Sequence, residues 1–273
     1  MKLKTMRPRL DFDAARTVLK KVYGIEAREI KELASERDQN FLAETSTGKL
    51  VLKVANLREE RAILDFQNQA LTHVAEQDPE LSIPRLKAAL SGGLIETTEG
   101  GHMCRLLNFL PGKLLANTRP HSDALLRDLG RFMGRLDSAL EGFSHDAQDR
   151  YLYWDSKHAA TTIREGLEYI ADDQRRSLVK QYLSSFEEIA PRLEPLPKGI
   201  IHNDGNDYNI LVRDGVMAGI LDFGDMVSSA LVFEVANTAA YCILDKNDPL
   251  EIASHVVAGY HEARPLSAAE LEL

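Results

Sequence analysis

Three oxygen-bearing side chains in the C-terminal half of the sequence have the types and spacing of a metal-assisted site. Asp204 and Asn209 lie in a polar segment after one short apolar run, and Asp222 follows another. Asp214-Gly215 between them is typical of a hairpin turn, because both residues tolerate positive φ. We therefore expect a loop and a strand end to bring the three side chains together. Carboxylate and amide oxygens suit Mg²⁺, which completes its ligand set with water and phosphate oxygens.

Such a set is typical of phosphoryl transfer, in which one Asp faces the attacking hydroxyl while an Asn and a second Asp hold the metal. Asp204 is the predicted catalytic residue, which accepts a hydrogen bond from a substrate hydroxyl and takes its proton late. Asn209 and Asp222 are the predicted ligands of Mg²⁺. His202 is expected to buttress the loop rather than to act as a base.

The segments that carry this chemistry also carry a family resemblance. His202–Asn209 reads HNDGNDYN, Asp222–Met226 reads DFGDM, and Val232–Ala236 reads VFEVA. Together they resemble the aminoglycoside phosphotransferase and choline kinase branch of the protein-kinase-like fold, and within it hydroxylysine kinase and its bacterial relatives. The resemblance begins near Phe12 and runs to the C-terminus. Asn203 stands where this family more often has Gly, which predicts an altered loop geometry rather than altered chemistry.

The resemblance implies an α+β fold with two lobes. Residues 1–109 would form a nucleotide-binding lobe around a small antiparallel sheet, and residues 110–273 a mostly helical lobe for catalysis and substrate binding. Apolar spacing and turn residues independently predict strands mainly in the first part and helices in the second. Helices are predicted at 11–23, 58–76, 124–140, 165–190 and 231–244, and strands at 27–34, 39–46, 49–55 and 103–109.

The resemblance also implies nucleotide contacts in the first lobe. Lys53 corresponds to the strand lysine that reaches the α- and β-phosphates of the nucleotide, although a lysine with a packed stem and a solvated head is the alternative. Ser35, Gln39 and Asn40 lie in or beside the loop that covers the phosphates in kinases, where their side chains would donate to phosphate oxygens. A polar hairpin tip without this task is the other interpretation of that loop.

Two further nucleotide contacts follow from family spacing. Gln67 stands where kinases have the Glu that pairs with the strand lysine, which implies a looser pairing with Lys53, unless Glu60 or Asp65 takes the role or Gln67 is structural. Backbone N–H and C=O groups near Asn108 and Phe109 would bind the purine edge. Backbone recognition leaves little side-chain signature, so it does not distinguish ATP from GTP.

A cluster of aromatic residues predicts the acceptor side. Residues 151–155 contain two Tyr and the only Trp of the sequence, Trp154, followed by Asp155. Aromatic rings beside a carboxylate suit an ammonium group through cation–π contact and charge. The alternative is that these rings plug a junction between helices. Asp207, Asp225 and Glu234 are additional acids that could contact a cationic substrate, although an acid in the first turn of a helix also satisfies the helix dipole.

Composition limits the classes of partner. The chain has 273 residues, 44% hydrophobic and 27% charged, with a formal charge of −9. This acidic balance argues against a nucleic-acid partner, which would require a basic face. Cys104 and Cys242 lie far apart and form neither a disulfide framework nor a zinc motif. The N-terminus lacks the apolar region of a signal peptide, and no run is long enough to span a membrane, so a cytoplasmic location without a membrane partner is expected.

The last residues predict the start of a helix. Pro265 and a Ser N-cap at 267 precede a first turn that ends at Leu273. A helix this short is marginal alone, which is what a fragment of a longer chain would show. The resembled family includes bacterial fusions to class III aminotransferase-like domains. The resemblance therefore implies such a fused domain if the chain is a fragment.

These features predict a small-molecule kinase that uses Mg²⁺ and transfers the γ-phosphoryl group of ATP or GTP to a hydroxyl of a cationic amine or amino acid, of the hydroxylysine or amino-alcohol type. Aminoglycoside, choline and homoserine kinases share every catalytic residue and are the nearest alternatives. A nucleotide-binding pseudokinase domain of a larger protein is suggested by Gln67. A metal-dependent phosphoesterase is suggested by the HNDGND spacing, but it would leave Lys53 without a role.

Overall fold

The computed structural model describes residues 7–273 and divides into two compact units. The N-terminal unit extends to Gly112 and also takes in Gly219–Leu221, while the C-terminal unit comprises Lys113–Ala218 and Asp222–Leu273. The first boundary thus falls three residues after the one expected from the sequence. None of the helices in residues 7–273 is long and apolar enough to cross a bilayer.

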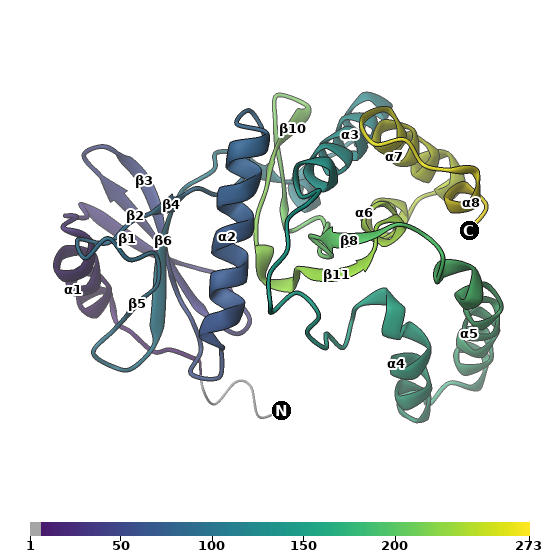
Figure 1. Ribbon diagram of the computed structural model, residues 1–273, viewed down its shortest axis with the longest axis horizontal. Helices are drawn as coiled ribbons and strands as arrows, with labels where there is room; N and C mark the ends of the chain where they lie inside the picture. Colours follow the sequence, from purple (N-terminus) through teal and green to yellow (C-terminus); the bar gives the residue numbers. More distant parts are fainter. Residues whose placement is uncertain (1–6) are drawn as a thin grey trace. The chain divides into compact units, whose positions relative to one another are not determined.

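An antiparallel sheet is the centre of the N-terminal unit (Figure 1). Its strands follow the order β1-β2-β3-β6-β4, and β5 pairs with β6 beside that path. Together with the helices of the other unit, this sheet confirms the predicted α+β class. The elements of the unit are α1 (Phe12–Tyr23), β1 (Glu29–Leu33), β2 (Gln39–Thr45), β3 (Gly48–Val54), α2 (Arg61–Gln77), β4 (Leu86–Lys87), β5 (Glu96–Thr97) and β6 (Met103–Asn108).

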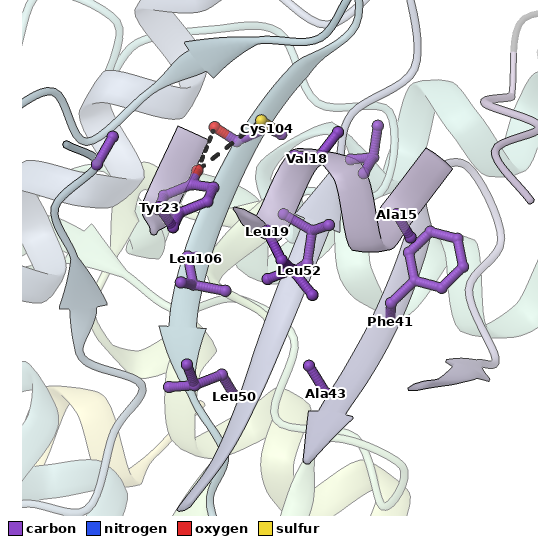
Figure 2. Packing of buried hydrophobic residues seen from close by; sticks show 12 residues of the cluster. Ala15, Val18, Leu19, Tyr23, Phe41, Ala43, Leu50, Leu52, Cys104 and Leu106 are labelled. Atoms are coloured by element: carbon purple, nitrogen blue, oxygen red, sulfur yellow. Dashed lines mark hydrogen bonds between the residues drawn. The ribbon is translucent and has the colours of Figure 1, made fainter. Parts of the chain in front are cut away.

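One face of this sheet is apolar and packs against α1 (Figure 2). The register places Phe41, Leu52 and Leu106 side by side on β2, β3 and β6, and all three side chains are fully buried. Leu19 of α1 lies in the same cluster. The helix ends at Gly24, whose φ of 67° is the left-handed conformation that glycine adopts without a steric penalty.

The opposite face of the sheet carries polar side chains. Asn40 lies across from Lys53, and Lys53 lies across from Arg105, so the three form one row over β2, β3 and β6. Because side chains alternate along a strand, this row points away from α1. Helix α2 contributes Gln67 and Asn68, whose side-chain oxygens accept hydrogen bonds from the Arg105 guanidinium.

The C-terminal unit is mainly helical. Helices α3 and α7 approach closely because Gly130 and Gly259 have no side chain: a Cβ at either position would lie within 2 Å of a backbone oxygen of the other helix. Residues 165–190 do not form the single helix predicted, since the chain is extended at Ile170 and Asp172 caps a new helix. The helices are α3 (Asp123–Ala139), α4 (Ala159–Gly166), α5 (Asp173–Leu193), α6 (Val232–Ile243), α7 (Pro249–Ala263) and α8 (Ala268–Leu271).

Two small sheets position the polar loops of this unit. Strand β8 (Lys198–Ile201) pairs with β11 (Val227–Ala230), and β9 (Ile210–Arg213) lies between β7 (Lys113–Leu114) and β10 (Val216–Ile220). The predicted hairpin turn joins β9 to β10, with positive φ at both Asp214 and Gly215. The segment after β8 therefore begins at His202 and ends where β9 begins, and the segment after β10 contains Asp222.

Candidate active site

Asp204 is held by two asparagine side chains of its own loop. Its Oδ1 accepts a hydrogen bond from Asn206 Nδ2 at 2.6 Å, and its Oδ2 accepts one from Asn209 Nδ2, also at 2.6 Å. Asn209 Nδ2 also donates to the Asp204 carbonyl at 3.1 Å. The structure therefore brings two of the three predicted site residues into direct contact. Asn206 was not singled out from the sequence, although it lies inside the HNDGNDYN segment.

The surroundings of Asp204 raise its affinity for a proton. Burial raises the pKa of Asp204 to about 6, and the charges of Asp225 and Asp222 add to the rise, while the hydrogen bonds from Asn206 and Asn209 oppose it. A carboxyl group with a raised pKa beside a polar loop is typical of a residue that accepts a proton during a reaction. The effect of Asp222 also places its charge near that of Asp204.

His202 is a buried part of the loop. Its Nδ1 accepts the backbone N–H of Asp204 at 3.2 Å, and its ring meets Phe223 edge to face with centroids 4.8 Å apart. With Nδ1 acting as an acceptor, the neutral ring carries its proton on Nε2. These contacts agree with the expected structural role, because His202 is fully buried and holds the segment on which Asp204 lies.

Asn209 and Asp222 have donor atoms that suit a divalent ion. The Nδ2 of Asn209 is directed to Asp204, which leaves its Oδ1 as the atom to offer a metal. Asp222 is exposed and lies just before the short 3₁₀ helix Phe223–Asp225, with a φ of 54°. Residues 7–273 contain no group of three or more His, Cys, Asp or Glu arranged to hold a metal. One amide and one carboxylate fit Mg²⁺, which takes its other ligands from phosphates and water.

Glu234 is not placed to contact a substrate, contrary to the prediction from sequence. Its side chain is fully buried, and Oε2 accepts the backbone N–H groups of His202 at 2.5 Å and of Asn203 at 3.1 Å. Burial raises the pKa of the Glu234 carboxyl to about 7, against the effect of these two hydrogen bonds. Glu234 therefore fixes the backbone of the loop that precedes Asp204.

Lys53 and Asn40 lie on the polar face of the N-terminal sheet. They are direct neighbours across β2 and β3, and each is half-buried. The Oδ1 of Asn40 is buried and has no hydrogen-bond partner among the described residues. Because buried amides are normally satisfied, this atom marks a place where a ligand group could complete the structure. Ser35 is half-buried in the loop that precedes β2.

Gln39 faces the other side of the sheet, so its predicted role in phosphate binding is wrong. Its side chain makes a reciprocal pair of hydrogen bonds with the backbone of Leu10, at 2.8 and 3.0 Å. Gln39 is buried, and strand alternation directs it away from its neighbour Asn40. It therefore joins the segment before α1 to β2.

Gln67 has a different partner from the one implied by the family. Its Oε1 accepts a hydrogen bond from Arg105 at 2.7 Å, and Asn68 Oδ1 accepts another from the same guanidinium at 2.8 Å. Arg105 is only 4% exposed. The amide of Gln67 thus anchors α2 to β6 through Arg105. Asp65, the alternative partner of Lys53, also accepts a hydrogen bond from Gln69 on its own helix. Arg105 was missed because strand pairing is not visible in the sequence.

The N–H groups of Asn108 and Phe109 are already used within the N-terminal unit. Asn108 donates to the Arg85 carbonyl at 3.0 Å, and Phe109 donates to the Lys49 carbonyl at 3.1 Å. The side chain of Asn108 accepts the Arg85 N–H at 2.5 Å. These donors cannot also bind a purine without breaking the sheet, so the expected use of both N–H groups is corrected.

The aromatic segment presents its indole at the surface of the C-terminal unit. Trp154 is 51% exposed, and its Nε1–H donates to Asp225 Oδ2 at 2.9 Å. Asp155 instead is fully buried, where it accepts from Ser229 Oγ at 2.8 Å and pairs with Lys157 at 2.9 Å. The structure therefore makes the exposed Trp154 and the half-buried Asp225 neighbours and gives Asp155 a structural position that a substrate cannot reach.

Tyr241 is a further residue near the acids that the sequence did not indicate. Burial, followed by the charges of Asp204, Asp207 and Asp225, raises the pKa of the Tyr241 hydroxyl. Asp207 is half-buried, and its carbonyl accepts the N–H of Ala116. Tyr241 lies in α6, one turn after Asn237, and nothing in its local sequence distinguishes it from an ordinary surface tyrosine.

Comparison with known proteins places this site in a family. Residues 29–270 match the phosphotransferase enzyme family. Hydroxylysine kinase from Mus musculus is 30% identical over 285 residues, which cover 94% of this chain and 75% of that protein. A homoserine kinase from Phenylobacterium zucineum is 29% identical over 236 residues, which cover 85% of this chain and 70% of that protein.

A solved structure shares the fold. Amicoumacin kinase, determined in complex with AMP-PNP and Ca²⁺, matches with a TM-score of 0.71 at 16% identity, covering 94% of this chain and 79% of that one. The sequence match extends over most of the chain and includes the loop that holds Asp204. The chain therefore belongs to the phosphotransferase enzyme family and is a small-molecule kinase.

Proposed function

We propose that this kinase phosphorylates a hydroxyl group of a cationic amino compound, with hydroxylysine as the foremost acceptor and related amino alcohols as the wider class. The observation that carries the proposal is the pair of Trp154 and Asp225 beside the catalytic loop. An exposed indole next to a carboxylate attracts an ammonium group both through the ring face and through charge. The charge of Asp225 also reaches Asp204, which supports an ammonium site close to the proposed proton acceptor.

The acidic surroundings of this pair support a cationic acceptor. Asp204, Asp207 and Asp225 all raise the pKa of the Tyr241 hydroxyl, so their negative charges lie in one region of the C-terminal unit. Crowded carboxylates are electrostatically unfavourable until cations lie among them. An acceptor with an ammonium group would relieve part of this repulsion on binding. A neutral or anionic acceptor would not.

Asp204 is the proposed proton acceptor in the transfer step. Its carboxylate would accept a hydrogen bond from the acceptor hydroxyl and take the proton as the hydroxyl oxygen bonds to the γ-phosphorus and the bond to the β-phosphate oxygen breaks. Asn206 and Asn209 hold both carboxylate oxygens in place for this contact. Asn209 and Asp222 would hold Mg²⁺, which when bound supplies positive charge at the phosphate oxygens.

On the nucleotide side, we propose that Lys53 binds the phosphates and that Asn40 and Ser35 contribute polar contacts. The partnerless Oδ1 of Asn40 supports this, because it lies on the sheet face of Lys53. Rotating the Asn40 amide would present its Nδ2 as a donor in place of the oxygen. The carbonyls of Asn108 and Phe109 remain as candidate acceptors for a purine amino group.

Homoserine is the second candidate acceptor, because homoserine kinases are similar to this chain at 29% identity. Homoserine and hydroxylysine are both α-amino acids with a side-chain hydroxyl. Hydroxylysine carries an additional side-chain ammonium group. Binding at the Trp154–Asp225 pair predicts that this second ammonium increases affinity, so hydroxylysine should be preferred.

The test is a coupled assay of nucleoside-diphosphate release with a panel of acceptors. The panel contains hydroxylysine, homoserine, an amino alcohol, choline and an aminoglycoside, each with ATP and with GTP in the presence of Mg²⁺. We expect hydroxylysine or an amino alcohol to give the highest kcat/KM and Asp204→Asn to slow the release by about 10²-fold or more. A preference for homoserine over hydroxylysine would contradict the assigned role of the second ammonium. Release that is independent of any acceptor would contradict the proposal as a whole.

A further inference from the structure

A closed chain of hydrogen bonds joins the catalytic loop to the proposed acceptor site. It begins at Asn203, the residue directly before Asp204. Asn203 Nδ2 donates to the carbonyl of Asp225 at 3.3 Å, and Asn203 Oδ1 accepts from Asn237 Nδ2 at 3.1 Å. Asn203 is only 5% exposed, so both contacts are largely shielded from water. One side chain thus connects the loop to the segment after Asp222 and to α6.

Further hydrogen bonds connect α6 to the segment that carries the indole of Trp154. Asn237 Oδ1 accepts a hydrogen bond from Ser156 Oγ at 3.0 Å, and Ser156 lies two residues after Trp154. Between them Asp155 is fixed by Ser229 and Lys157. Trp154 Nε1–H then donates to the side chain of Asp225, whose carbonyl is the group bound by Asn203. Asp225 is therefore bound through its carbonyl by Asn203 and through its carboxylate by Trp154. The segment that carries Trp154 is also bound to α6 through Ser156.

We propose that Asn203 is a positioning residue that sets the place of the Trp154–Asp225 pair relative to Asp204 and thereby determines the affinity for the acceptor. This inference rests on the proposed function, because it assigns acceptor binding to that pair. It goes further in predicting that a residue which touches neither nucleotide nor acceptor controls the KM for the acceptor.

The backbone at this position explains why an asparagine can serve here. Asn203 has a φ of 65°, the left-handed region that glycine adopts freely and asparagine tolerates better than most residues. The sequence predicts that an asparagine in place of the family's more frequent glycine alters the loop, and the structure shows what differs. Asn203 occupies a conformation that glycine adopts readily, and its side chain adds two hydrogen bonds that glycine cannot make.

Asn203→Gly is the sharpest variant, because it permits the same φ and removes only the side-chain contacts. We expect the KM for the acceptor to rise about 10-fold, as for the loss of one or two buried hydrogen bonds. The kcat at saturating acceptor and the KM for ATP should stay within about twofold, since no group that meets the nucleotide changes. Asn247→Gly, at an exposed loop position, is the matched control and should leave every parameter unchanged.

Ser156→Ala tests the same chain from its other end. It removes the contact with Asn237 and should raise the acceptor KM in the same direction but by less. The double variant with Asn203→Gly should show less than the product of the two single effects, because both changes act on one connected set. Multiplicative effects would show that Asn203 and Ser156 act independently.

Trp154 is the only tryptophan in the chain, so its fluorescence reports the position of the acceptor site without any turnover. We expect Asn203→Gly to increase acrylamide quenching of Trp154 and to shift its emission to longer wavelength, while Asn247→Gly does neither. Unchanged quenching would overturn the positioning role. Increased quenching with an unchanged acceptor KM would overturn the link to affinity. A wild-type enzyme that phosphorylates no amine would overturn the proposed function, and the quenching result would still decide whether Asn203 holds Trp154.

Discussion

The two units hold their polar site residues by different means. In the N-terminal unit, Asn40, Lys53 and Arg105 lie in one row because three regular strands are in register. In the C-terminal unit, Asp204 lies in a loop and depends on side-chain hydrogen bonds from Asn206 and other residues for its position. Strand pairing fixes a side chain through the backbone, whereas a loop must be fixed by polar contacts. We therefore expect changes in the first unit to act locally and changes in the second to act through connected residues.

The two regions also carry charges of opposite sign. Lys53 and Arg105 are cations directly opposite each other, an arrangement that is unfavourable in a sheet. Amide oxygens from α2 stabilise the Arg105 guanidinium there. Around Asp204 the crowded charges are negative, and together with burial they raise the pKa of Asp204. A cationic strand row suits phosphates, and an acidic loop region suits an ammonium group and a metal ion.

The largest expected effect is that of Asp204→Asn. Losing the proton acceptor should lower kcat by about 10²–10⁴-fold, the usual range for a general base. Nucleotide binding should persist, because the assigned phosphate contacts lie in the other unit. Steady-state kinetics together with a thermal shift by Mg-ADP would measure both. Loss of the thermal shift would show that Asp204 supports the fold or the nucleotide rather than the transfer step.

Lys53→Met tests the cationic row. We expect kcat/KM for ATP to fall by about 10²-fold, as for the removal of one preorganised charge at a reacting phosphate. Lys49→Met is the matched control on the same strand, because Lys49 is half exposed and forms a surface ion pair with Glu44. If the two variants lose equal activity, the row of Asn40, Lys53 and Arg105 has no special role in phosphate binding.

Arg105→Met separates stability from charge in the same row. It would leave the buried oxygens of Gln67 and Asn68 without their donor, which should lower the free energy of unfolding by about 2–3 kcal/mol. Urea unfolding would measure the loss. Lys20→Met removes an exposed ammonium paired with Glu26 and should cost much less, because exposed ion pairs contribute little to stability. Equal losses would mean that the α2 anchor is no stronger than a surface pair.

A smaller effect, on the free energy of unfolding, is expected from two buried carboxyl groups and should depend on pH. Asp137 of α3 and Glu234 are both buried, and burial raises the pKa of each carboxyl, with the charge of Glu234 adding to the rise at Asp137. Raised pKa values mean that the folded protein binds protons more tightly than the unfolded chain. Stability from this pair is therefore fully present at low pH and is lost as pH rises from the usual carboxyl range through about 7.

Asp137→Asn should remove much of this loss, because the amide oxygen can still accept the hydrogen bond that Tyr260 donates to Asp137. We expect the variant to be more stable than the wild type by about 1–2 kcal/mol at pH 8 and nearly equal to it at about pH 4. Chemical unfolding over this pH range is the measurement. A stability difference of the same size at both pH values would exclude the titration of this pair as its cause.

Local patterns predicted the catalytic loop better than the sheet face. The loop residues lie within one short segment, so Asp204 and Asn209 were expected together and make direct contact. Gln39 and Gln67 were assigned to the nucleotide wrongly because their partners, Leu10 and Arg105, lie far from them in the sequence. The face of the sheet on which each side chain lies decides which partner it meets. A single sequence shows alternation along a strand but not which strand lies beside it.

Burial explains two further errors. Asp155 and Glu234 have the charge that suits an amine, and the sequence gives no sign that both are fully buried. Each instead binds neighbouring backbone or side-chain groups of the same unit. Asn203 was noted only for its type, because the two partners that give it a role lie far along the chain.

The most direct test of the central claim is ³¹P NMR of the products formed from ATP, Mg²⁺ and hydroxylysine. The proposed role of Asp204 in deprotonating an amino-compound hydroxyl predicts ADP and one new phosphomonoester resonance, with neither formed by Asp204→Asn. Inorganic phosphate as the sole new phosphorus species besides ADP, at a rate independent of hydroxylysine and of the other amine acceptors, would contradict it.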